Sequence, residues 1–168
     1  GGWVTGNLDT HDQLGRLLAD AVGAVVVSVD YRLAPEAKFP AAADDCLAAY
    51  EWALAHADEV GADPQRVAIG GDSAGGNLGA VVALDARERG LPQPKLQLLV
   101  YPVTEYELDS ASMIDNAKGY LLEAETMAWF WDHYARTPAD FADPRCSPMR
   151  AADLSGLARA VVVTAAYD

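Results

Sequence analysis

The stretch that decides the fold is Gly71-Asp72-Ser73-Ala74-Gly75-Gly76-Asn77. The short apolar run 66–70 precedes it, and a segment of helical composition follows it. Gly-x-Ser-x-Gly between a strand and a helix is typical of the nucleophile elbow, a sharp turn that lifts a serine hydroxyl out of the sheet. We expect side chains at positions 71 and 75 to collide with the neighbouring strand and helix, so both positions require glycine.

The elbow would do two things for Ser73. It makes the hydroxyl accessible to a base, without which serine is a poor nucleophile. It also aims the N–H of Ala74, at the new helix N-terminus, toward an anion that forms near Ser73. The alternative interpretation is a glycine-rich turn in which the Ser73 side chain merely caps the helix.

Composition narrows the class of protein. The chain has 168 residues, enough for one domain with a hydrophobic core. Its formal net charge is −13 and it has no basic run, which argues against nucleic acid and against stable membrane association. The longest apolar runs, 21–29 and 96–103, are shorter than the roughly 18 residues that a membrane span requires.

The cysteines and the other potential ligands indicate no metal site. Cys46 and Cys146 lie far apart in the sequence, so we expect two free thiols in a reducing, cytoplasmic compartment. No His, Cys or Asp cluster has the spacing of a metal site. The glycines of 70–76 lack the lysine of a P-loop and the spacing of a dinucleotide fingerprint. We therefore expect no metal and no cofactor.

Apolar runs alternate with amphipathic stretches along the chain. This alternation predicts an α/β fold, with a mostly parallel sheet that helices cover on both faces. Gly23 is well placed to end the first helix. The predicted strands are 24–29, which we expect to be buried, 66–70, 96–101 and 160–164; the predicted helices end at 23, span 41–57, follow 73 and span 119–136.

One stretch interrupts this rhythm. No strand is predicted between 104 and about 150. A connection of this length between two strands of a sheet is typical of a lid or cap. Ordinary surface packing of a connecting helix would produce the same pattern. We therefore predict one domain, 1–168, with a cap or connecting insertion at about 104–150.

With these segments placed, the chain resembles the hormone-sensitive-lipase-like family of α/β-hydrolases, the bacterial family IV carboxylesterases with an HGGG oxyanion motif. Gly1-Gly2-Trp3-Val4 is similar to the end of that motif, and 71–77 matches the family's GDSAGGN elbow. Residues 164–168 resemble the start of the segment that carries the acid of the catalytic triad. Further matches are 8–12, 30–36, 39–42, 129–134, 147–149 and 154–157.

The resemblance implies the catalytic residues. Ser73 is then the nucleophile of a Ser-His-Asp triad, and Asp168 is the acid that orients the histidine. The oxyanion hole is then made of the backbone N–H groups of Gly1, Gly2 and Ala74. The plain alternatives are a solvated carboxylate at Asp168 and a flexible terminus at Gly1 and Gly2.

None of the three histidines of the chain is expected to complete the triad. We place His11 in the loop after the oxyanion glycines, His56 at a helix end and His133 in the cap helix. The resemblance puts the catalytic histidine beyond Asp168, so we expect an internal fragment of an α/β-hydrolase domain, truncated at both ends and inactive by itself.

Two polar residues of the elbow are expected to have structural roles. Asp72 is expected to hold the loop rather than to transfer protons. Asn77, in the first helical turn, is expected to bond to local backbone.

The resemblance implies a carboxylic ester hydrolase that acts on short- to medium-chain acyl esters through an acyl-enzyme. Its partner is a small-molecule ester, and the full-length parent is a candidate homodimer. An aromatic stripe on the cap helix could border the acyl pocket. A non-catalytic ligand-binding receptor on the same fold, as in the gibberellin receptors of plants, and a dehydratase stay open as alternatives. The stripe consists of Met127, Phe130, Trp131 and Tyr134.

Overall fold

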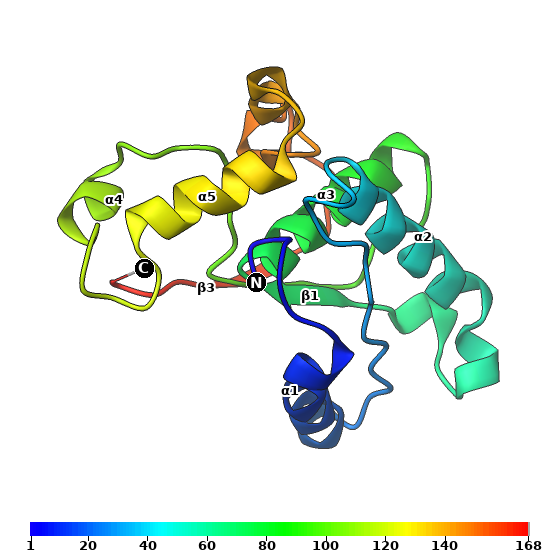
Figure 1. Ribbon diagram of the computed structural model, residues 1–168. Helices are drawn as coiled ribbons and strands as arrows, with labels where there is room; N and C mark the ends of the chain where they lie inside the picture. Colours follow the sequence, from blue (N-terminus) through cyan, green and yellow to red (C-terminus); the bar gives the residue numbers. More distant parts are fainter. Residues whose placement is uncertain (168) are drawn as a thin grey trace.

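The computed structural model describes residues 1–167 and shows helices that alternate with parallel strands (Figure 1). The α-helices are α1 (Leu8–Val22), α2 (Ala41–Ala55), α3 (Ala74–Glu88), α4 (Ala111–Asp115) and α5 (Ala124–Tyr134). The 3-10 helices are η1 (Ala57–Val60), η2 (Pro64–Arg66), η3 (Pro138–Ala142) and η4 (Pro148–Arg150). The strands are β1 (Ile69–Asp72), β2 (Gln97–Val100) and β3 (Ala160–Val163).

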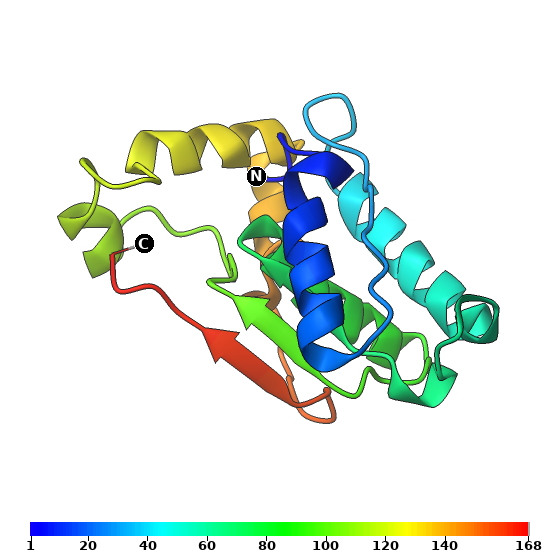
Figure 2. The ribbon, with the colours of Figure 1, turned by 90° about the horizontal axis from the view of Figure 1, so that it is seen from below.

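The three strands form one parallel sheet in the order β1-β2-β3. Parallel neighbours need long crossover connections. Here α3 connects β1 to β2, and the segment 104–150 lies between β2 and β3. The strand arrowheads in Figure 2 point to the side of the molecule that holds α4 and α5. The carboxyl ends of all three strands therefore meet at the edge of the sheet beside the 104–150 segment.

The central helix α3 is the most buried element of the described chain. It packs against β1 and β2 on one side and against α2 on the other. Glycine at position 76 permits this approach, because a Cβ there would lie only 2.9 Å from the Cβ of Pro102. α1 lies on the opposite side of the sheet from α3 (Figures 1 and 2).

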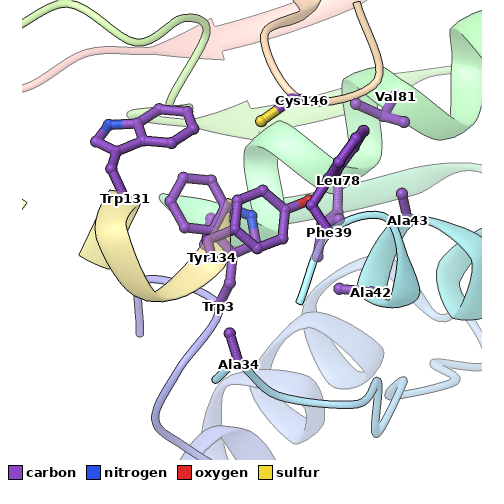
Figure 3. Close-up of a cluster of buried hydrophobic side chains, with 11 residues drawn as sticks. Trp3, Ala34, Phe39, Ala42, Ala43, Leu78, Val81, Trp131, Tyr134 and Cys146 are labelled. Atoms are coloured by element: carbon purple, nitrogen blue, oxygen red, sulfur yellow. The ribbon is translucent and has the colours of Figure 1, made fainter. Parts of the chain in front are cut away.

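The main hydrophobic core joins the amino terminus to the 104–150 segment (Figure 3). The indole of Trp3 stacks on the ring of Tyr134, with 4.4 Å between the centroids, and lies 4.8 Å from the ring of Trp131. All three side chains are buried. α5 therefore packs through its aromatic residues into the core that α3 and the amino terminus share.

An ion-pair network fastens the 104–150 segment to the helical layer. Arg145 donates to the carboxylate of Asp85 in α3 at 2.9 Å and to that of Asp44 in α2 at 2.6 Å. The Asp85 side chain is only 5% exposed, whereas the Asp44 side chain is 49% exposed. Arg145 thus compensates a buried charge, and its removal would leave Asp85 unpaired.

The predicted helices and three of the four predicted strands are confirmed, with shifted bounds. α1 begins earlier than its apolar stripe, at a capping box formed by Asn7 and Thr10, and it ends at Gly23 with φ 61°. This positive φ favours glycine, as expected for a helix C-cap. As predicted, the structure contains no strand over 104–150.

The buried strand predicted at 24–29 is wrong. The segment has no strand pairing in the part of the chain that the structure describes. Val25, Val26, Val27 and Val29 are 37% to 50% exposed. α1 buries none of its residues either. The run of β-branched residues favours extended backbone, but burial requires a partner strand, and none of the described strands lies beside it.

The described helices do not include one suited to a bilayer. No helix within residues 1–167 combines the length and the apolarity needed to cross a membrane.

Candidate active site

Ser73 occupies a strained turn between β1 and α3. Its backbone has φ 52° and ψ −116°, an unusual conformation for a residue other than glycine. Its N–H donates to the carbonyl of Val100 at 2.9 Å, and its carbonyl accepts from the N–H groups of Asn77 at 3.0 Å and Val103 at 3.3 Å. Such strain costs of order 1–3 kcal/mol and persists where the surroundings over-determine it, most often at functional sites.

The Ser73 side chain does not cap α3, because it makes no hydrogen bond to the N-terminal amides of the helix. The helix-cap interpretation of the motif is therefore not supported. The hydroxyl stands at the start of α3 and at the carboxyl end of β1, as the elbow interpretation predicts.

Glycine is required at one of the two elbow positions that the sequence singled out. A Cβ at Gly71 would lie 2.4 Å from the carbonyl carbon of Gly75, a distance that no real contact tolerates. The same expectation for position 75 is wrong, since a Cβ at Gly75 would meet nothing within 4 Å. Gly75 supplies the backbone that blocks position 71, and its own missing side chain points into open space.

The amino-terminal glycines lie beside the elbow. Trp3, which follows these glycines directly, shares one buried core with Ala74 and Leu78 of α3. Gly2 has φ +62°, in the left-handed region that favours glycine. Ala74 is buried at the first position of α3. The structure thus brings the loop of Gly1 and Gly2 to the elbow.

Asp72 contacts α1 through the side chain of His11. Its Oδ1 lies 3.7 Å from Nε2 of His11, and Nδ1 of that histidine lies 2.9 Å from the hydroxyl of Thr10. His11 belongs to α1 and not to a loop, which corrects the sequence-based placement. The contact agrees with the structural role predicted for Asp72.

Asn77 bonds to distant backbone, so the expectation of a local bond is wrong. Its Nδ2 donates to the carbonyl of Val103 at 2.8 Å and to that of Cys146 at 3.0 Å. The residue is fully buried. It therefore ties the start of α3, next to Ser73, to both ends of the 104–150 segment.

The predicted acid and base of the triad are not placed by the structure. Asp168 lies outside the described residues. β3 ends at the same edge of the sheet as Ser73, since the carbonyl of Val163 accepts from the N–H of Tyr101 after β2. Within residues 1–167 no histidine is hydrogen-bonded to Ser73. His133, for example, has its Nδ1 2.8 Å from the carbonyl of Trp129.

The sequence did not predict the conformation of Tyr101 or the contact of Phe130 at this edge. Tyr101 has φ 36° and is 39% exposed, and it follows Val100, whose carbonyl accepts from the N–H of Ser73. The ring of Phe130 occupies the space where a side chain of Gly2 would be. The aromatic stripe of α5 marked Phe130 as apolar, but nothing in the sequence pairs it with Gly2, and no local signal marks Tyr101.

Within the described residues, neither a metal-binding cluster nor the surface hollow beside Tyr50 lies at this edge. Among the residues described, no three His, Cys, Asp or Glu side chains gather so that they could hold a metal ion. A hollow of about 410 Å³ is lined by Tyr50, Val67 and Lys95 among others and contains none of the predicted site residues.

Known proteins share this architecture. A family model described as alpha/beta hydrolase fold matches residues 1–168. Carboxylic ester hydrolase LipN of Mycobacterium tuberculosis is 50% identical over 174 residues, covering 100% of this chain and 46% of its own length. Ethyl acetate hydrolase of Pseudomonas putida is 44% identical, with coverage of 100% and 53%.

The solved structures agree. A thermostable esterase from Pseudomonas putida ECU1011 matches with a TM-score of 0.97 and 43% identity, covering 100% of this chain and 53% of that chain. A Pyrobaculum calidifontis esterase matches with a TM-score of 0.96 and 46% identity, covering 100% and 55%. The chain spans about half the length of the curated relatives it matches.

The chain belongs to the α/β-hydrolase family, and the fold and the family expected from its motifs are confirmed.

Proposed function

We propose that the protein is a carboxylic ester hydrolase that acts on short- to medium-chain acyl esters, with Ser73 as its nucleophile. The observation that carries this proposal is the strained conformation of Ser73 at the end of β1, with the glycine loop of the amino terminus packed against the start of α3 through Trp3. The relatives named carboxylic ester hydrolase, ethyl acetate hydrolase and arylesterase support the same reaction.

The proposed mechanism is acyl transfer through the serine. The Ser73 Oγ attacks the acyl carbon while a histidine takes its proton, the alcohol leaves with that proton, and water then hydrolyses the acyl-enzyme. We place this histidine outside residues 1–168 and assign Asp168 as the carboxylate that orients it. The first attack turns the carbonyl oxygen into an oxyanion.

The backbone N–H groups of Gly1, Gly2 and Ala74 are proposed to receive this oxyanion. Ala74 begins α3, whose aligned peptide dipoles favour negative charge at that end. Glycine at position 2 allows the left-handed backbone seen there. Removal of one such donor typically costs about 10²–10³ in turnover.

We further propose that residues 104–150 act as a cap beside the site, and that the protein works in the cytoplasm on a small-molecule ester without a cofactor. The buried contacts of α5 with Trp3 support a cap that is firmly attached to the core. A homodimer of the full-length protein is proposed as well.

Hydrolysis of p-nitrophenyl butyrate by the full-length protein tests the reaction. Ser73→Ala should lower kcat by about 10⁴-fold or more, and Asp168→Asn by about 10⁴-fold, through loss of histidine orientation. Ser155→Ala is the matched control, because the Ser155 hydroxyl bonds only to Asp153 on the surface. Activity that survives Ser73→Ala would exclude Ser73 as the nucleophile.

A further inference from the structure

The ring of Phe130 occupies the space in which a side chain at position 2 would lie. A Cβ built on Gly2 would lie 2.1 Å from Cδ1 and 2.2 Å from Cγ of that ring, so no other residue fits at position 2 while the ring is in place. Gly2 itself is buried. The contact joins α5 to the amino-terminal loop across more than a hundred residues of sequence.

The next residue is anchored by the same helix. Trp3 is fully buried, with its indole stacked on Tyr134 of α5 at an interplanar angle of 5°. Its carbonyl accepts from the N–H of Ala34 at 2.9 Å. Trp3 has φ 61°, so two consecutive residues hold a left-handed backbone that only surrounding contacts can maintain in the tryptophan.

We infer that Phe130 is a positioning residue for the oxyanion-binding amides. Its ring closes the space into which the Gly2 backbone could relax and so fixes the direction of the N–H groups of the loop. This inference rests on the proposed function, because it assigns those groups to the oxyanion. Glycine alone has wide conformational freedom, and donors must be held within about 0.5 Å of the productive geometry to act on a transition state.

The role inferred for Phe130 differs from the role predicted for the aromatic stripe. From the sequence, the four residues of the stripe are only candidates for the border of an acyl pocket. A pocket wall would affect how tightly the substrate binds, whereas a residue that positions the oxyanion donors affects the transition state more than the ground state.

The test compares Phe130→Ala with Phe141→Ala in the full-length protein. Phe141 is the matched control, since it is a partly buried phenylalanine of the same core and the same segment, and its ring packs on Tyr106 and Trp131 rather than on Gly2. The measurements are kcat and KM for p-nitrophenyl butyrate and the inhibition constant of butylboronic acid, which forms a tetrahedral adduct with a reactive serine.

Phe130→Ala should lower kcat about 10- to 100-fold with KM changed less than about twofold, and should weaken the boronic acid by a similar factor. Phe130→Leu retains much of the bulk and should recover most of the loss, which guards against a misfolded alanine variant. Phe141→Ala should lower the unfolding temperature without this kinetic pattern.

An equal loss of kcat in the Phe130→Ala and Phe141→Ala variants, or a change confined to KM, overturns the inference. These outcomes leave the proposed function intact as long as Ser73→Ala is inactive. An active Ser73→Ala variant overturns the proposed function instead, so the two failures can be told apart.

Discussion

Asn77 in the first turn of α3 donates to the carbonyl of Cys146, 69 residues further along the chain, at 3.0 Å. The same Nδ2 donates to the carbonyl of Val103 at 2.8 Å. One buried amide therefore fixes where the 104–150 segment leaves and rejoins the layer that carries Ser73.

Asn77→Ala should lower the free energy of unfolding by about 2–4 kcal/mol, because it leaves the carbonyls of Val103 and Cys146 without this donor. Asn77→Asp should cost more at neutral pH, since a buried carboxylate would face two carbonyl oxygens. Its deficit should shrink as the pH falls and the carboxyl takes up a proton. Denaturant unfolding at several pH values measures both. Two variants of equal, pH-independent stability would contradict the assigned role of the amide.

Gly71→Ala and Gly75→Ala form a second, sharper comparison. The added methyl at 71 would overlap the backbone of Gly75, so we expect a loss of about 1–3 kcal/mol in unfolding free energy and a displaced elbow. At 75 the methyl meets open space within a helix, where alanine is favoured over glycine by about 1 kcal/mol. Thermal unfolding of both variants measures this difference, and a destabilised Gly75→Ala would show that a side chain at position 75 does collide with its surroundings.

Ser73 carries backbone strain that its substitutions should reveal. Ser73→Ala and Ser73→Gly both remove the hydroxyl, but only glycine tolerates φ 52° at low cost. We expect Ser73→Gly to be more stable than Ser73→Ala by about 1 kcal/mol or more. Denaturant midpoints with equal m-values give this difference, and equal stabilities would mean that the turn is unstrained.

Arg145 compensates the buried Asp85. Arg145→Met should cost about 3–5 kcal/mol, because it leaves that carboxylate buried and unpaired. The double variant Asp85→Asn/Arg145→Met is the matched control and should recover much of the loss. If the single and the double variants are equally destabilised, the loss comes from the packing of the arginine and not from its charge.

The pKa of Asp85 decides whether the unfolding free energy rises or falls with pH. Burial raises the pKa of the Asp85 carboxyl above its ordinary value, and the Arg145 guanidinium opposes this only in part. Between the unfolded and the raised folded pKa, the folded protein holds a proton that the unfolded chain has released, so the unfolding free energy falls as pH rises. Arg145→Met should steepen this slope and regain stability on acidification.

The motif at 71–77 was sufficient to predict the strand, the turn and the helix around Ser73. Those features follow from sterics within a few residues, which the local sequence encodes directly. The expectation that a side chain at Gly75 would collide with its neighbours was wrong, because such a collision depends on which way the first residues of the helix face. The local sequence also misjudged 24–29, since apolar β-branched residues indicate extended backbone and say nothing about which strand pairs with it.

For the candidate site, the sequence by itself determined the residue types: a serine on a sharp bend, glycines that free the backbone, and a buried helix start. Only the tertiary structure decided the partners. It packs Phe130 on Gly2, joins Asn77 to the carbonyl of Cys146 by a hydrogen bond, and pairs Arg145 with Asp85. The reason is physical: backbone conformation is fixed by neighbours in the chain, whereas packing and charge compensation join residues that meet only after the chain has folded.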